Sequence, residues 1–327
     1  MKMQSKQQYS WKTLLISTAV LVLTGCAQRD LEMMPDCGDL NLFFDWSGLG
    51  DADTAPTSMK VLFYNTVGDT LSVSGGSGAL QAVLPFGQYK MLTYNKNAQG
   101  VGFRNLENLS QAEAYALPLS LPNLAPTLLR MAYAAPAGTY LAQPRNLYGA
   151  GGDTLNLLLG DAESDTLKPQ TLIKQITLDI KVSGDISSVT SCNLTLENIA
   201  SGVSLLTGVP IYGKPGTIAF DSNTTTSGFA ATMSYFGKDT TAVSHELSLV
   251  LTFVDGGVQD VKTDFSTAME QVEETTIPVN VQVDIDVTHT DAGFKATLQG
   301  WNIVEGTIVV GEIQKRTELI EKNKPIK

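Results

Sequence analysis

The chain has few of the residues that most often carry out chemistry in proteins. Its 327 residues include three cysteines and two histidines, and charged residues make up 17%. The histidines, His245 and His289, lie far apart in the sequence, and neither has a cysteine or carboxylate at a metal-ligand spacing. We therefore expect no metal site and no cofactor.

Motifs for nucleophilic catalysis and phosphate binding are also absent. The sequence has no Gly-x-Ser-x-Gly elbow, and the glycine cluster at residues 75–78 lacks the Lys-Ser/Thr pair of a phosphate-binding loop. A glycosidase needs two carboxyl groups, but paired acids such as Asp51 with Asp53, or Glu273 with Glu274, are typical of solvated loops. These absences predict a protein that is not an enzyme.

One acidic segment leaves an alternative open. Asp161, Glu163 and Asp165 stand at alternate positions, from which carboxylates can converge on a hard cation such as Ca²⁺. The turn glycine of the known calcium-binding loop is missing here. A solvated linker is the interpretation that we favour.

No apolar run is long enough to cross a membrane as a helix. Lys2, Lys6 and Lys12 precede the uncharged apolar segment 14–23, which has about half of the ~20 residues that a membrane-spanning helix needs. This layout predicts a signal peptide over residues 1–25.

The four residues that end this segment, Leu23, Thr24, Gly25 and Cys26, resemble the bacterial lipobox. In such signals, small residues precede the cleavage site and the cysteine thiol carries a diacylglycerol. We therefore predict lipid attachment at Cys26, followed by a tether over residues 26–38. A conventional signal peptide cleaved near Gly25, with Cys26 incidental, is the alternative.

Cleavage before Cys26 changes what the rest of the chain carries. Taking three lysines and no acid from a formal net charge of −11 gives −14. An acidic surface argues against nucleic acid and anionic lipid headgroups as partners. Cys37 and Cys192 remain, and they could form one disulfide, but their wide separation favours two free thiols.

The hydrophobic pattern predicts strands with one buried and one solvated face. Apolar residues alternate with polar ones over residues 40–44, 176–182 and 277–287. Such alternation is typical of antiparallel sheets. The best helix candidates are short, at residues 109–116 and 266–273. The chain is therefore predicted to be all-β and built of sandwiches.

Residues 84–89 (Leu-Pro-Phe-Gly-Gln-Tyr) are predicted to form a corner between two strands. Proline cannot donate to a sheet ladder, glycine permits the turn, and Tyr89 re-enters a strand with its ring on the buried face. We assign the segment to folding and not to ligand binding.

The polar segment 161–170, which contains Pro169, is the best boundary between two domains. We expect an N-terminal β-sandwich at residues 39–165 and a C-terminal β-sandwich at residues 166–311. The charged residues 312–327 are expected to form a flexible tail.

Short motifs across the expected mature chain carry a resemblance to a known family. In the first half they are Asp45-Trp46, Pro56, Ser58-Met59, Val61-Leu62-Phe63-Tyr64, the 84–89 segment and Tyr94-Asn95. Those further along are Asn146-Leu147-Tyr148 and the runs 177–184 and 196–203. With these motifs the chain resembles the fimbrillin-like surface lipoproteins of Bacteroidales, in a branch described mainly as a domain of unknown function.

The resemblance implies two tandem transthyretin-like Greek-key β-sandwich domains. It also implies a palmitate-bearing lipoprotein anchored in the outer membrane and exposed at the cell surface, with a role in pilus assembly or adhesion. The implied partners are other pilus subunits or surface proteins.

Resembling pilins expose an acceptor groove after an arginine-specific protease removes their first strand. Here no arginine lies between Arg29 and Arg104, whereas the first two strands are expected near residues 40–45 and 59–64. Cleavage between those strands is not expected. We therefore interpret the chain as an anchor, terminal or accessory subunit.

A glycan-binding outer-membrane lipoprotein of a polysaccharide-capture system is the alternative function. Such a protein should present at least two coplanar aromatic rings on one exposed surface, whereas a fimbrial module should bury nearly all of its rings. Trp46, Trp301 and the tyrosines are the candidates, although both tryptophans stand in or beside apolar strand patterns.

Overall fold

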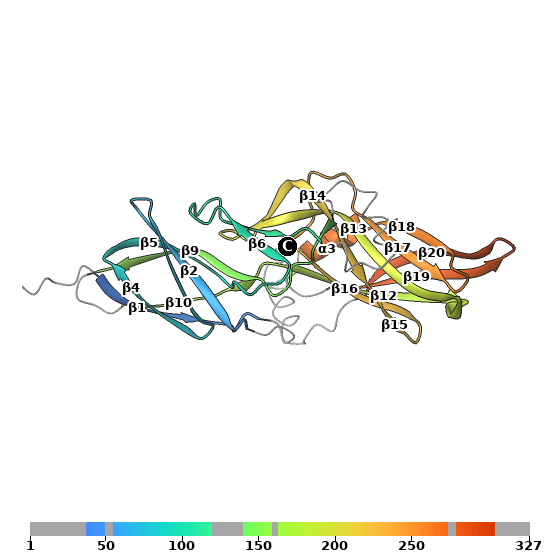
Figure 1. Ribbon diagram of the computed structural model, residues 1–327, viewed down its shortest axis with the longest axis horizontal. Helices are drawn as coiled ribbons and strands as arrows, with labels where there is room; N and C mark the ends of the chain where they lie inside the picture. The colour runs from blue at the N-terminus through green and yellow to red at the C-terminus, as the bar shows by residue number, and fades with distance from the viewer. Residues whose placement is uncertain (1–36, 50–54, 120–139, 159–162, 274–278, 305–327) are drawn as a thin grey trace, which may run out of the picture.

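The computed structural model describes residues 37–49, 55–119, 140–158, 163–273 and 279–304. These residues form an elongated molecule in which two β-sandwiches follow one another along the long axis (Figure 1). The predicted all-β fold class is confirmed. The expected signal peptide (1–25) and tail (312–327) lie outside the described residues.

The first sandwich packs a three-stranded sheet against a five-stranded sheet. The smaller sheet has the order β10-β1-β4, with β10 (Glu163–Leu167), β1 (Cys37–Phe44) and β4 (Ala79–Pro85). The larger has the order β11-β9-β5-β2-β3, with β11 (Gln170–Thr171), β9 (Tyr148–Leu157), β5 (Gly87–Tyr94), β2 (Ser58–Asn65) and β3 (Thr70–Gly76). Leu40, Leu42 and Phe44 of β1 point into the core between the sheets, as their alternation predicts.

The second sandwich packs a five-stranded sheet against a seven-stranded sheet. The five-stranded sheet has the order β15-β16-β12-β19-β20, with β15 (Asn223–Thr225), β16 (Gly228–Tyr235), β12 (Lys174–Gly184), β19 (Val279–Thr290) and β20 (Gly293–Val304). The other runs β18-β17-β13-β14-β8, with β18 (Val258–Asp264), β17 (Glu246–Phe253), β13 (Val189–Ser204), β14 (Pro210–Asp221) and β8 (Tyr140–Leu141). Its two further strands are β6 (Val101–Arg104) and β7 (Glu113–Ala116), of which β7 pairs with β13.

The expected strand pairing and helices need two corrections. The β1–β10, β12–β19 and β8–β14 pairs are parallel, and the long stretch of chain between the partners supplies the crossover that a parallel pair needs. The segment 109–116 is not a helix, since its second half is β7, whereas α3 (Ser266–Glu273) forms where predicted. The pairing of β7 with β6 and β13 overrides the helix propensity of its Glu and Ala residues.

The corner predicted at residues 84–89 is confirmed. β4 ends at Pro85 and β5 begins at Gly87. Tyr89 is buried, and its hydroxyl donates a hydrogen bond to the Pro85 carbonyl oxygen at 2.8 Å, which fixes the corner. Its ring also packs edge-to-face against Phe63 in the core.

The connection between β5 and β9 leaves the first sandwich and joins the second. From this stretch, β7 pairs with β13 and β8 pairs with β14 (Figure 1). The stretch also contacts the first sandwich, because the Tyr64 hydroxyl donates to the Leu106 carbonyl oxygen at 2.8 Å and the Phe103 ring centroid lies 4.5 Å from that of Tyr94. The expected domain boundary between residues 165 and 166 falls within β10, and the division into domains 39–165 and 166–311 stays a prediction.

Candidate functional site

The predicted lipid-attachment motif, Leu23, Thr24, Gly25 and Cys26, lies outside the described residues. The described chain begins in β1, at one end of the long axis (Figure 1). β1 is the central strand of its sheet and is hydrogen-bonded to β4 on one side and β10 on the other. In the described part of the chain, no helix has both the length and the apolar character that crossing a membrane requires.

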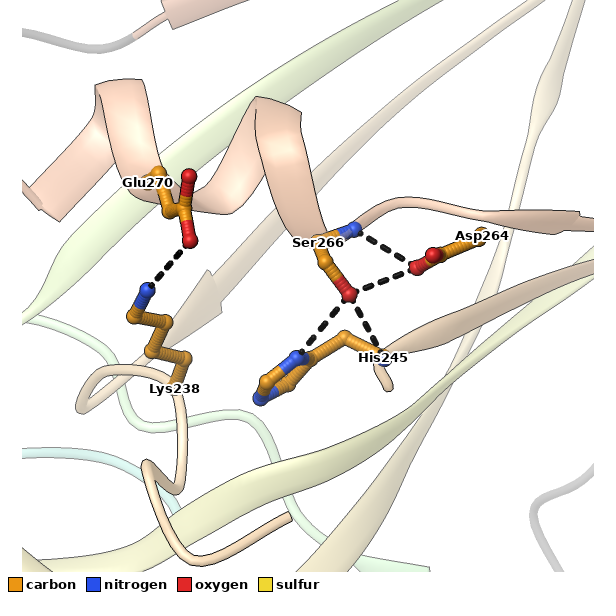
Figure 2. A network of polar contacts seen from close by, with 5 residues as sticks. All are labelled: Lys238, His245, Asp264, Ser266 and Glu270. Atoms are coloured by element: carbon orange, nitrogen blue, oxygen red, sulfur yellow. Dashed lines mark hydrogen bonds and ion pairs between the residues drawn. The ribbon is translucent and has the colours of Figure 1, made fainter. Parts of the chain in front are cut away.

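The polar network that most resembles a catalytic centre surrounds the start of α3 (Figure 2). Ser266 Oγ donates to Asp264 Oδ1 at 2.6 Å and lies 3.4 Å from His245 Nδ1. The Ser266 backbone N–H donates to the same carboxylate oxygen at 3.0 Å, and the His245 backbone N–H donates to Ser266 Oγ at 3.1 Å. These bonds tie the first residue of α3 to the end of β18 and to the residue that precedes β17.

This network contains the three residue types of a hydrolytic triad, but their order in space differs from that of a triad. In a triad, histidine lies between serine and carboxylate and takes the serine proton. Here the Ser266 proton is directed to Asp264, and the hydrogen bond from Ser266 is the largest cause that lowers the pKa of Asp264. Burial lowers the pKa of His245, which favours its neutral form. The three side chains therefore hold a helix terminus in place.

A buried carboxylate fixes the loop that precedes β17. Asp239 is fully buried and accepts hydrogen bonds from the Gly213 N–H at 2.8 Å and from the Thr241 N–H at 2.9 Å. Burial alone raises the pKa of Asp239, but the hydrogen bonds from Thr241, Gly213 and Lys214 outweigh it and bring the pKa below its ordinary value. Beside it, Lys238 Nζ lies 3.3 Å from Glu270 Oε1 (Figure 2). The hydrogen bonds from Gly213 and Thr241 to Asp239 therefore have a structural role, since they join this loop to β14.

The described acids and histidines that were considered as ligands form no group of three that could hold a metal ion. Glu163 and Asp165 lie on β10, and Asp165 Oδ1 accepts from the Thr166 N–H at 2.7 Å. His289 stands near the end of β19, with its ring 4.9 Å from Phe294. Over the described ranges, no three His, Cys, Asp or Glu side chains are placed to hold a metal ion. The remaining acids considered as ligands or catalytic pairs, Asp51, Asp53, Asp161 and Glu274, lie outside the described residues.

The two described cysteines are free thiols in different sandwiches. Cys37 begins β1, and Cys192 is buried in β13. Burial raises the pKa of Cys192 to about 12, which keeps it an unreactive thiol. Of the two alternatives left open by the sequence, the structure has the free thiols.

Most aromatic rings are withdrawn from the surface. Trp46 donates its Nε1–H to the Ser77 carbonyl oxygen at 2.7 Å, and the Trp301 ring lies 5.5 Å from that of Phe265. Within the described ranges, the exposed aromatic residues are Phe43 on β1 and Tyr212 on β14. These two lie in different sandwiches and cannot form one stacking platform.

A polar pocket of about 520 Å³ opens where the two sandwiches meet. Asp153 and Thr154 of β9 and Asp165 and Thr166 of β10 line it, together with the turn 205–208 of the second sandwich. β9 is bulged here, and Gly152 adopts a φ of +96° that favours glycine. The sequence repeats Asp-Thr-Leu at both lining positions, but sequence reasoning missed that the distant turn 205–208 lies beside β9 and β10.

Comparison with known proteins finds a family and a relative. A family model described as "Domain of unknown function (DUF5119)" matches residues 25–221. A curated protein of Bacteroides ovatus, named "Putative fimbrium anchoring subunit Fim4B", is 34% identical over 109 residues. That match covers 31% of this chain and 31% of the relative, so it spans about a third of the relative's length.

Solved structures share the fold at low sequence identity. A crystal structure described as "a putative adhesin from Bacteroides ovatus" matches with a TM-score of 0.60 at 16% identity, over 82% of this chain and 95% of that chain. Another, described as "putative polysaccharide binding proteins (DUF1812)" from Bacteroides thetaiotaomicron, matches with a TM-score of 0.50 at 10% identity, over 82% and 98%. At these identities the likeness concerns the fold alone.

Proposed function

The chain belongs to the family described as Domain of unknown function (DUF5119), and on that premise we propose that it is a non-enzymatic subunit that anchors or ends a fimbrium at the cell surface. The observation that carries the proposal is the partial match to a relative named as a fimbrium anchoring subunit. In this proposal, a lipid on Cys26 holds the protein in the outer membrane.

The path of the chain supports an anchoring role. A tether from Cys26 would enter the fold at β1, at one end of the long axis, and the second sandwich occupies the other end (Figure 1). β1 is paired on both edges, so a pull on the tether would have to break two rows of hydrogen bonds to extract it. The far end of the molecule would then be free to meet other pilus subunits.

The placement of the arginines supports a subunit that does not repeat along a shaft. The first arginine after Arg29 is Arg104, which lies on β6, beyond β1 to β5. It forms an ion pair with the buried Glu113 of β7, and its guanidinium lies 4.8 Å from the centre of the Tyr115 ring. Cleavage there would leave β1 paired in its sheet, and no acceptor groove would open.

Glycan capture is less well supported by the described surface. Stacking on sugar rings needs exposed aromatic platforms, and Phe43 and Tyr212 lie in different sandwiches. We therefore prefer a role in pilus assembly or adhesion through protein contacts.

A pull-down of the tagged protein from detergent-extracted outer membranes tests the proposal. Other pilus subunits should co-purify with the tagged protein. A Cys26→Ser variant, which would lack the lipid, is the control for membrane context. Recovery of polysaccharide-system proteins in place of pilus subunits would contradict the proposed function.

A further inference from the structure

Two glutamine side chains bind backbone groups at the outer edges of the five-stranded sheet. On one side, Gln259 Nε2 of β18 donates to the Ala296 carbonyl oxygen at 2.7 Å, and Gln259 Oε1 accepts from the Ala296 N–H at 2.7 Å. On the other side, Gln143 Oε1 accepts from the Ser234 N–H at 3.0 Å. Gln259 lies on β18, at one edge of the seven-stranded sheet, and Gln143 shortly follows β8, at its other edge.

These three hydrogen bonds are made where this sheet lacks a further strand. β20 is its outermost strand on one side, and β18 of the other sheet lies beside it (Figure 1). On the other side, β15 covers β16 only from Gly228 to Ala230, so Ser234 lies beyond its reach. Ala296 and Ser234 are nevertheless only 3% and 5% exposed.

Unpaired edge groups are the template on which another chain adds a strand, and natural sheets block them with side chains or charge. A primary amide has both donor N–H groups and an acceptor oxygen, so Gln259 binds both the N–H and the C=O of Ala296 as a neighbouring strand would. The nearby edge strand of the seven-stranded sheet is blocked by charge. There Lys262 of β18 is exposed and lies 2.5 Å from Glu246 Oε1 and 3.8 Å from Asp260 Oδ2.

We infer that Gln259 and Gln143 block strand addition at Ala296 of β20 and at Ser234 of β16, whether by a second copy of this chain or by an extended segment of another protein. At these two positions, a partner of the second sandwich would then not be added as a further strand of this sheet. The inference goes beyond the proposed function, because it holds for the isolated protein whether or not a fimbrium is its context.

The test uses Gln259→Leu, which keeps the side-chain size and removes both hydrogen bonds. Hydrogen exchange at the Ala296 amide should accelerate roughly fivefold or more, as the loss of one hydrogen bond predicts. Sedimentation over a concentration series should show oligomers that are absent from the unsubstituted protein. Gln282→Leu is the matched control, because Gln282 lies on the interior strand β19 of the same sheet and its amide binds Asp284 at 2.8 Å.

Gln143→Leu repeats the test on the opposite side of the sheet, where hydrogen exchange is measured at the Ser234 amide. This second variant decides the question if Gln259→Leu does not fold. Unchanged exchange at Ala296 and Ser234 would overturn the inference. Faster exchange without oligomers would also overturn it, because the glutamines would then be local stabilisers only.

Discussion

At the residue scale, strict alternation of apolar and polar side chains identifies the most deeply buried positions. Val281, Val283, Ile285 and Val287 of β19 are each at most 1% exposed, whereas the residues between them face outward or lie half-buried. Alternate side chains share a face because the side-chain period of a strand is two residues. Polar side chains bind across elements instead, as Ser266 of α3 does with Asp264 of β18 and with His245.

Placing a charge at one of these buried positions should unfold the second sandwich. Val281→Asp would bury an unpaired carboxylate between the sheets at a cost of several kcal/mol, roughly the size of a whole domain's stability margin. Asp284→Asn, on the partly exposed face of the same strand, should change stability by about 0.5 kcal/mol or less. Urea unfolding and protease resistance measure both, and an Asp284→Asn variant more damaged than Val281→Asp would refute the assigned faces.

Acid should weaken the fold through His245. Because burial holds the pKa of His245 below its ordinary 6.5, the unfolded chain takes up a proton at a higher pH than the folded protein does. The stabilising effect of the neutral ring is therefore complete above pH 6.5 and declines as the pH falls toward the folded pKa. Urea unfolding between about pH 7.5 and 5.5 should show this slope.

The slope should be smaller in His245→Gln than in the unsubstituted protein. Equal slopes in the His245→Gln variant and the unsubstituted protein would rule out His245 as the acid-sensitive group.

At the element scale, the strands with clean periodicity are predictable from sequence, and their long-range pairing is not. The described residues of the segments 40–44, 176–182 and 277–287 lie in β1, β12 and β19 as expected, and α3 begins and ends as predicted. The segment 109–116 was misread, because its helix-favouring composition is overruled by pairing with β13, far along the chain. The pocket at the junction was missed for a related reason, since the turn 205–208 of the second sandwich lies beside β9 and β10 only in the folded molecule.

The β6–β7 hairpin should couple the unfolding of the two sandwiches. Phe103 of β6 packs on Tyr94 of β5, while β7 is a strand of the second sandwich. Protein that begins at residue 26 contains two tryptophans, Trp46 in the first sandwich and Trp301 in the second. Changing Trp301 to Phe leaves the fluorescence of Trp46 as the probe of the first sandwich, and changing Trp46 to Phe leaves Trp301 as the probe of the second. Their thermal midpoints should coincide in otherwise unsubstituted protein.

Phe103→Ala should destabilise this junction by about 1–3 kcal/mol and separate the two midpoints. The exposed ring of Phe43 offers the control, because Phe43→Ala should leave the midpoints together. Two distinct midpoints before any change at Phe103 would show that the sandwiches unfold independently.

At the scale of the whole molecule, the arrangement of β1 separates an anchor-type subunit from a shaft subunit. Purified protein that begins at residue 26, incubated with an arginine-specific protease, should remain monomeric, because Arg29 lies before β1 and Arg104 lies after β5. Gel filtration and denaturing gels follow the reaction. Ladders of stable oligomers after protease treatment would indicate a polymerising pilin.

The most direct measurement for the proposed anchoring role is the fate of the filaments when Cys26 is changed to Ser in cells that assemble them. Palmitate labelling should be lost, because Cys26 is the predicted lipid carrier and stable membrane attachment takes about two acyl chains. Filaments should then appear in the medium with this subunit still bound. Unchanged labelling, or filaments that stay on the cells in the absence of the lipid, would contradict the account.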